Sequence, residues 1–200
     1  MDSTFLNLQK QMINVIETQI PDVKIIEPKV FNDSRGYFFE SYSHKEFIEK
    51  VCKTTFVQDN ESFSKYGVLR GMHYQLPPYA QSKLVRVVLG KVLDVAVDVR
   101  KGSPTFGKYV AVELSDANKR QLFIPRGFAH GFLTLSEIAI FNYKCDSYYV
   151  PNHEGAFCWN DPTIGIHWPI SPDKIILSDK DRVLPLFDSA TYFNYSDNLY

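Results

Sequence analysis

Short hydrophobic runs separated by turn-forming residues dominate the chain from residue 24 to residue 149. The runs are rich in Val, Ile, Leu and aromatic residues, and the stretches between them hold Gly, Pro, Asn, Asp or Ser. Many short strands with turns between them indicate a sandwich or barrel, and argue against a parallel sheet with crossover helices. The predicted strands include residues 24–30, 56–60, 83–89, 92–99, 109–114, 121–124 and 138–146.

Gly90 and Lys91 separate two of these runs. A two-residue connection that contains Gly is typical of a tight β-hairpin. We therefore expect residues 83–89 and 92–99 to pair as neighbouring antiparallel strands.

The predicted strand 138–146 has one apolar and one polar face. Successive side chains of a strand point to opposite sides of its sheet, which places Tyr143 on the apolar face with Cys145. A buried phenol needs a hydrogen-bond partner, so Tyr143 is either a core tyrosine bonded to backbone or a functional group. The strand 83–89 is apolar on both faces, so Lys83 at its start needs a counter-charge or a ligand if it is buried.

The two ends of the chain show other patterns. Apolar residues between positions 2 and 18 recur at helical spacing, which predicts an accessory helix that ends near Pro21. Ser43 and Glu46 form a capping box, which predicts a short helix that ends near Val51. The last 50 residues are rich in Pro and Asp, which indicates loops and short helices over one end of the barrel.

A single domain is expected over residues 1–200, because this length is typical of one domain with a sizeable core. Fifteen Phe, twelve Tyr and eleven Pro residues suit a β-rich fold with many turns. Within this domain we expect an accessory N-terminal helix over residues 1–20, a barrel over 22–150, and C-terminal loops and short helices over 151–200.

Composition narrows the possible partners and the compartment. The formal net charge is −1 at pH 7, which provides no attraction to nucleic acid or to an anionic membrane. Cys52, Cys145 and Cys158 are odd in number and far apart, so neither a disulfide framework nor a zinc site is expected. No segment has the pattern of a signal peptide or the length of a membrane span. We therefore expect a cytoplasmic protein that binds neither nucleic acid nor membrane.

The segment 68–75 combines a strand-like apolar pattern with Arg70, Gly71 and His73. Glycine within a strand often marks the close approach of a ligand or another backbone. His73 is a satisfied core histidine, an exposed strand residue, or a catalytic base inside the barrel. Its ordinary pKa of about 6.5 suits proton abstraction at neutral pH.

Residues 125–132 resemble the second cupin motif, PxGxxH, with Gly127 and His130 at its defining positions. A cupin is a jelly roll of two sheets. Metal-binding cupins supply a His-x-His pair from their first motif, whereas the matching stretch here begins at His73 and lacks the second histidine. A firm iron or zinc site needs imidazole pairs and a carboxylate. We therefore expect no metal, and a metal-dependent cupin oxygenase is disfavoured.

Eight short segments occur together in an order that resembles one family. They are DSRG at 33–36, FVQDN at 56–60, RGMHYQ at 70–75, QSKLV at 81–85, DVAVD at 94–98, PRGFAHGF at 125–132, YKC at 143–145 and LSDKD at 177–181. From about Ile25 to about Leu186 the chain resembles the dTDP-4-dehydrorhamnose 3,5-epimerases. Two features depart from that family: Glu61 stands where histidine is common, and the predicted N-terminal helix precedes the usual start.

The resemblance implies a mainly β fold, a cupin-type jelly-roll barrel, and an isomerase activity. The implied reaction removes the C3 and C5 protons of a dTDP-linked 4-keto-6-deoxy sugar, next to its ketone, and returns protons to the opposite faces. Because the ketone is itself the electron sink, the resemblance implies no cofactor.

Four residues carry the implied chemistry. His73 would be the base, and Asp181 would pair with its other ring nitrogen and fix its tautomer, as the carboxylate does in a catalytic triad. Tyr143 would be the acid on the far face of the sugar. Lys83 would stabilise the negative charge that develops on O4.

Further residues would hold the nucleotide sugar by the same resemblance. Arginines suit the diphosphate because the guanidinium can bind two oxygens at once, and Tyr149 would stack on thymine. The family is a homodimer built by strand exchange near the N-terminus, so part of the nucleotide site would come from the partner. His153 and His167 are expected to be structural. The implied set is Arg35, Glu40, Gln58, Asp59, Asn60, Arg70, His130, Tyr149, Glu154 and Lys180.

Two alternatives remain beside the 3,5-epimerase. An epimerase that inverts one carbon only, or acts on a related nucleotide-linked keto sugar, would use the same base, acid and lysine. A non-catalytic cupin that binds nucleotide sugars is disfavoured, because His73, Tyr143 and Asp181 are all present.

Overall fold

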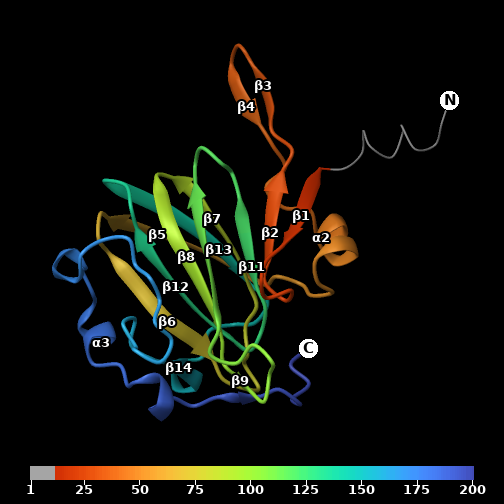
Figure 1. Ribbon diagram of the computed structural model, residues 1–200. Helices are drawn as coiled ribbons and strands as arrows, with labels where there is room; N and C mark the ends of the chain where they lie inside the picture. Colours follow the sequence, from red (N-terminus) through yellow and green to blue (C-terminus); the bar gives the residue numbers. More distant parts are fainter. Residues whose placement is uncertain (1–11) are drawn as a thin grey trace.

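Two antiparallel sheets face each other in the computed structural model, which describes residues 12–200 (Figure 1). The first sheet has the strand order β1 (Ile13–Glu17), β2 (Lys24–Pro28), β11 (Gln121–Ile124), β7 (Lys83–Leu89), β13 (Ile138–Cys145) and β5 (Gln58–Lys65). The second has the order β10 (Tyr109–Ser115), β8 (Lys91–Asp98), β12 (Phe128–Thr134), β6 (Leu69–Gln75) and β14 (Glu154–Ala156).

The main core lies between the inner faces of the two sheets. Val85 on β7 and Phe141 on β13 belong to the same buried cluster as Ala96 on β8 and Phe132 on β12. Such interdigitation of two inner faces is the packing of a double-sheet jelly roll. The predicted mainly β class and jelly-roll barrel are therefore confirmed.

The predicted hairpin between residues 83–89 and 92–99 is wrong. β7 lies between β11 and β13 in the first sheet, whereas β8 lies between β10 and β12 in the second. The chain crosses from one sheet to the other at Gly90, which has a φ of +84°. A side chain there would meet the carbonyl oxygen of Ile138. The two-residue spacing indicated a turn correctly, but pairing depends on neighbours that are distant in sequence.

The predicted N-terminal helix is wrong where the structure describes it, and its residues 2–11 lie outside the described part. Residues 13–17 form the edge strand β1, which pairs with β2 so that Val15 lies opposite Ile26. Three of its five residues are β-branched, and such side chains suit a pleated surface. An apolar spacing of three or four residues over so short a segment fits a strand as well as a helix.

The barrel is also longer than residues 22–150. β1 extends it before residue 22, and β14 extends the second sheet beyond residue 150 by pairing with β6. The remaining C-terminal elements are short, as expected. They are α3 (Asp179–Arg182), the 3₁₀ turns Pro151–His153, Pro172–Lys174 and Phe187–Ser189, and β15 (Phe193–Asn194), which pairs with β9 (Arg100–Lys101).

One hairpin projects away from the two sheets (Figure 1). It is formed by β3 (Phe31–Asp33) and β4 (Gly36–Phe38), and every residue of both strands is exposed. Its turn is at Ser34 and Arg35. The helix α2 (His44–Lys50) follows, and the backbone N–H of Glu46 donates to the Ser43 hydroxyl as the capping box predicts.

The sheets bring distant segments together around β6. β6 lies between β12 and β14, and His73 on β6 is paired with His130 on β12. In the facing sheet, β7 and β13 pair so that Lys83 lies opposite Cys145. The inner faces of these four strands form the walls of a cavity. None of the helices within residues 12–200 is long and apolar enough to cross a membrane.

Candidate active site

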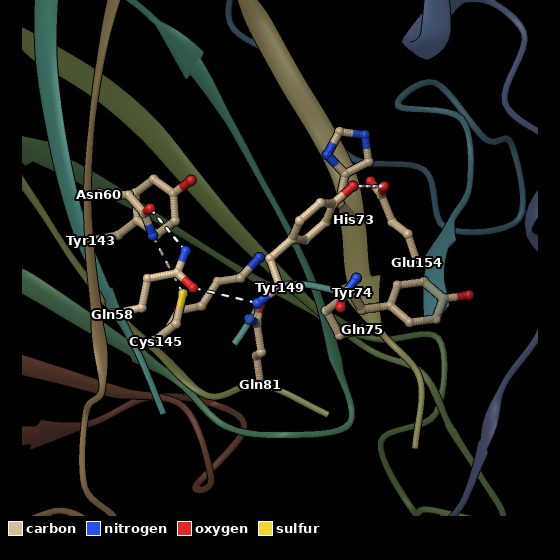
Figure 2. A pocket seen from close by; sticks show the side chains of 11 residues that line it. Gln58, Asn60, His73, Tyr74, Gln75, Gln81, Tyr143, Cys145, Tyr149 and Glu154 are labelled. Carbon is tan, nitrogen blue, oxygen red and sulfur yellow. Dashed lines mark hydrogen bonds between the residues drawn. The ribbon is translucent and has the colours of Figure 1, made fainter. Parts of the chain in front are cut away.

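Two adjoining pockets lie between the sheets and share His73, Lys83 and Tyr143. Their volumes are about 310 Å³ and 260 Å³, close to the lower end of the range for small-molecule sites. The first, here called the amide pocket, is also lined by Gln58, Asn60, Tyr74, Gln75, Gln81, Cys145, Tyr149 and Glu154 (Figure 2). The second, here called the basic pocket, is also lined by Ser62, Arg70, His130, Phe132, Phe141, Ser178, Lys180 and Asp181.

His73 and Asp181 form a hydrogen-bonded pair, as the family resemblance implied. His73 Nε2 lies 2.6 Å from Asp181 Oδ1. Burial alone would raise the pKa of Asp181, but the hydrogen bond and charge of His73 together lower it. The backbone N–H of Asp181 donates to the Ser178 hydroxyl, which holds the carboxylate at the start of α3. An ionised Asp181 therefore accepts the Nε2 proton and leaves His73 Nδ1 with a free lone pair.

Tyr143 lies on the wall opposite His73 (Figure 2). It is on β13, packed beside the core, on the face predicted by the alternation of residues 138–146. Its hydroxyl has no hydrogen-bond partner among residues 12–200, which argues against a core tyrosine bonded to backbone. Burial raises the pKa of the Tyr143 phenol. The phenol therefore stays protonated at neutral pH and can donate a proton into the cavity.

Lys83 is a half-buried cation in the strand predicted over residues 83–89. It starts β7 and lines both pockets. Burial lowers the pKa of its ammonium. In the described part of the chain the ammonium makes no hydrogen bond or ion pair, so its charge is available to a ligand.

Four of the expected binding residues line the amide pocket. Gln58 Nε2 donates to Asn60 Oδ1 at 2.9 Å, and the Tyr149 hydroxyl donates to Glu154 Oε2 at 2.8 Å (Figure 2). Lys180 also donates to that Glu154 oxygen from the basic pocket. The Tyr149–Glu154–Lys180 bridge therefore links the loop before β14 to α3 at the place where the pockets adjoin.

Three of the expected binding residues line the basic pocket, and two of them, Arg70 and Lys180, are cations that stand there beside Lys83. Arg70 contacts the Ser64 hydroxyl at 3.3 Å, and the side chain of Lys180 is 56% exposed. His130 is buried and lies 2.9 Å from Asp94 through its Nε2. Arg70 and Lys180 give this pocket a positive character that suits phosphate oxygens.

Three expected binding residues do not reach the cavity. Asp59 lies on the outer face of β5, where it pairs with Lys144 at 2.6 Å. The alternation of β5 excludes it, because Gln58 and Asn60 take the inner face. Arg35 is at the tip of the projecting hairpin, paired with Asp33, and Glu40 follows that hairpin. Neither Arg35 nor Glu40 lines the cavity of its own chain.

Sequence reasoning missed several lining residues that strand periodicity could have found. Gln75 is two residues after His73 on β6, and therefore on the same face of the strand. Cys145 holds the same relation to Tyr143 on β13. Asp94 does not line either pocket, but it stands with Asp98 in the otherwise apolar strand β8, and acids in such a strand are a signal of paired buried carboxylates.

A double-sheet jelly roll with ionisable side chains gathered between its sheets defines the class as a cupin-type protein. The family model of dTDP-4-dehydrorhamnose 3,5-epimerase matches residues 17–189. The Salmonella typhimurium enzyme of that name is 59% identical over 182 residues, which cover 90% of this chain and 98% of that protein. The chain belongs to the dTDP-4-dehydrorhamnose 3,5-epimerase family.

Solved structures agree with this assignment. The 3,5-epimerase of Legionella pneumophila, crystallised with dTDP-4-keto-L-rhamnose, has a TM-score of 0.89 and 48% identity, covering 92% of this chain and all of that one. ChmJ, a 3′-monoepimerase from Streptomyces bikiniensis solved with dTDP-quinovose, has a TM-score of 0.80 and 34% identity, covering 86% and 87%.

Proposed function

We propose that this protein inverts C3 and C5 of a dTDP-linked 4-keto-6-deoxy-D-glucose to give the 4-keto-L-rhamnose nucleotide. The observation that carries the proposal is the placement of the His73–Asp181 pair and Tyr143 on opposite walls of one cavity, with Lys83 in both pockets. A relative at 59% identity that bears this activity's name supports the same reaction.

His73 takes the proton from the sugar. Its Nε2 is engaged by Asp181, so Nδ1 is the atom that accepts the proton. The C3 and C5 protons are acidic because each carbon is bonded to the C4 carbonyl carbon. When Nδ1 is protonated, the ionised carboxylate of Asp181, 2.6 Å from the ring, stabilises the charge of the imidazolium.

Lys83 and Tyr143 complete the exchange. Loss of the proton moves negative charge onto O4, and the half-buried Lys83 ammonium stabilises that enolate. The Tyr143 phenol then delivers a proton to the opposite face of the same carbon, which inverts it. Before the next step the His73 imidazolium releases its proton to solvent and the Tyr143 phenolate takes one up from solvent, so both groups return to their starting states and no redox change occurs.

The two pockets suit parts of the substrate that differ in charge. The basic pocket, with Arg70 and Lys180, suits the diphosphate. The amide pocket offers Gln58, Asn60 and Tyr149, which suit uncharged hydroxyl and carbonyl groups. The relative crystallised with dTDP-4-keto-L-rhamnose supports a nucleotide-linked keto sugar as the ligand.

A homodimer is part of the proposal. The projecting hairpin exposes Tyr37 by 57% and Phe38 by 68%, and it carries Arg35. Exposed aromatic residues on an extended hairpin favour packing against another chain. The partner would then receive Arg35 and Glu40 at its own cavity. We place the protein in the cytoplasm, because its three cysteines are free.

Proton NMR in deuterium oxide tests the function directly. With dTDP-4-keto-6-deoxyglucose, we expect deuterium to enter C3 and C5 as the product forms. His73→Ala should reduce exchange at both carbons by on the order of 10²–10⁴-fold, since one base serves both. His167→Ala is the matched control, because His167 lies outside both pockets. Full exchange in folded His73→Ala would contradict the assignment.

A single-carbon epimerase is the second candidate, because the 3′-monoepimerase ChmJ shares this fold. The same NMR experiment separates the two functions. Exchange and inversion at C3 alone would favour the single-carbon reaction, and inversion at both carbons would favour the 3,5-epimerase.

A further inference from the structure

Two histidine–aspartate pairs have their histidines side by side on the second sheet. His73 and His130 are cross-strand partners on β6 and β12. His73 contacts Asp181, and His130 contacts Asp94 through Nε2 and Oδ2 at 2.9 Å. The pairs resemble each other in composition, but the surroundings of the two carboxyl groups differ.

Asp181 lies at the edge of the barrel among groups that stabilise a negative charge. His73 donates to it, and Lys180 is close enough to lower its pKa further. Its environment therefore favours the ionised carboxylate.

Asp94 is in the barrel interior. It is 0% exposed and points from β8 to the same side as the core residues Val92 and Ala96. Its Oδ2 meets His130, whereas its Oδ1 has no hydrogen-bond partner in the described structure. An ionised carboxylate here would be a buried charge with a single donor, which is very costly. A protonated carboxyl could donate its hydrogen to His130 and would leave only a neutral carbonyl oxygen without a partner.

The charged groups around this pair do not reverse the preference of Asp94 for its protonated form. Lys83 and His73 face it from β7 and β6, and neither donates a hydrogen bond to Asp94. Burial raises the pKa of Asp94, although His130 and Lys83 oppose the shift. Burial also lowers the pKa of His130, against the opposing effect of Asp94. Both members of the pair therefore shift towards their uncharged forms.

We propose that Asp94 is protonated in the working enzyme and acts as a positioning residue for His130. Its hydroxyl donates to His130 Nε2, which fixes the ring proton of His130 on Nδ1. Nδ1 has no partner within residues 12–200, and His130 lines the basic pocket. His130 is thereby a neutral hydrogen-bond donor to an oxygen of the bound substrate.

The two neighbouring histidines then hold opposite tautomers. His73 keeps its proton on Nε2 and presents a lone pair, so it is a base. His130 keeps its proton on Nδ1, so it is a donor and cannot compete for the sugar protons. The His130 ring lies nearly parallel to that of Phe141, at 20° and with the ring centroids 6.1 Å apart, which restricts its rotation. The substrate contact rests on the proposed function, but the proton positions do not.

NMR of the free protein tests the proton positions without any substrate. In protein labelled with ¹⁵N-histidine and ¹³C-aspartate, we expect the Nδ1–H tautomer at His130 and a protonated carboxyl at Asp94 at neutral pH. Signals are assigned by their loss in His130→Gln and Asp94→Asn. An Nε2–H tautomer at His130, or an ionised Asp94, would overturn the proposal even if the protein is an active epimerase.

Matched substitutions test the consequence for catalysis. Asp94→Asn keeps an uncharged group beside His130, so we expect kcat and KM to stay within about threefold of wild type. Asp181→Asn removes a charge that His73 needs and should lower kcat by on the order of 10²–10⁴-fold. Asp94→Leu leaves His130 without its partner and should raise KM about tenfold. If Asp94→Asn loses as much activity as Asp181→Asn, Asp94 acts as an anion and the proposal is wrong.

Discussion

At the scale of single residues, Tyr143 allows proton removal to be separated from inversion. The variant Tyr143→Phe keeps the ring against the core but removes the proton donor. His73 can still take a proton and return it to the same face. We expect deuterium to enter the sugar faster than the inverted product appears, whereas in wild type both proceed together. Equal rates of inversion in Tyr143→Phe and wild type would mean that the proton comes from elsewhere.

Lys83 affects an earlier step and has its own pH signature. Lys83→Met should slow deuterium exchange itself, because the enolate loses its cation. Burial lowers the pKa of Lys83, so the ammonium is lost as pH rises through a value below that of an exposed lysine. We expect the alkaline decline of kcat to begin below the ordinary lysine range. In Lys83→Arg this decline should move to higher pH, since arginine keeps its proton. An alkaline limb that stays in place would show that another group titrates there.

At this scale the sequence predicted which residues are catalytic better than it predicted which residues surround them. The facing of Tyr143 followed from period-two alternation, and the pairing of His73 with Asp181 followed from the family resemblance. Asp59 was included because its motif was treated as a block, although alternation within that motif turns it outward. The partner of His130 could not be read from the sequence, because Asp94 is 36 residues away on another strand.

At the scale of elements, the close contact of β6 and β12 supports the site. A Cβ added at Gly131 would lie 2.8 Å from the Arg70 carbonyl oxygen and 2.6 Å from Met72 Sδ. We expect Gly131→Ala to lower the free energy of unfolding by about 1–3 kcal/mol through overpacking, measured by urea denaturation. It should also lower kcat, because His73 and His130 lie on the two strands that must separate.

Gly165→Ala is the control for that prediction. Gly165 has a φ of +61°, and the nearest atom to an added Cβ is 3.9 Å away. Its replacement should cost about 1–2 kcal/mol for the left-handed backbone, with kcat unchanged because it lies outside both pockets. A Gly131→Ala protein as active as Gly165→Ala would show that the strand spacing does not position the histidines.

The sequence predicted those elements whose structure depends on neighbouring residues. It did not predict those features that depend on pairing with strands distant in the chain. The strand 83–89 and the capping box at Ser43 depend on neighbours within a few residues, and both are present. The partner of β7 depends on β11 and β13, which are distant in the chain, so the Gly90 turn was assigned to the wrong pairing. β1 was mistaken for a helix because its strand character comes from pairing with β2.

At the scale of the whole molecule, the projecting hairpin has no evident role in a chain that functions as a monomer. Arg35 is paired with Asp33 at the tip, and its side chain is 87% exposed. A residue that binds diphosphate in its own chain would lie near Arg70 and Lys180 in the basic pocket, and Arg35 does not line that pocket. The proposed exchange of hairpins between two chains would account for both the exposed aromatic residues and the position of Arg35.

Mixing two inactive variants tests this exchange. Arg35→Ala alters the hairpin, which each chain would contribute to the active site of its partner. His73→Ala alters the cavity, which belongs to the chain's own active site. In a mixed dimer, the intact hairpin of the His73→Ala chain meets the intact cavity of the Arg35→Ala chain, which restores one site. Co-refolding equal amounts should therefore recover about a quarter of the wild-type sites, because half of the dimers are mixed and each has one good site of two.

The control is a mixture of His73→Ala and Tyr143→Phe, which both damage the cavity. No pairing of those chains yields an intact site, so the inversion rate of the mixture should equal the mean of the two separate rates. Sedimentation of each mixture verifies that dimers have formed. If the Arg35→Ala and His73→Ala mixture also gives only the mean of its parents, the hairpin serves its own chain or none. Recovery in that mixture alone requires that each active site is built from two chains, because no other combination joins an intact Arg35 to an intact His73.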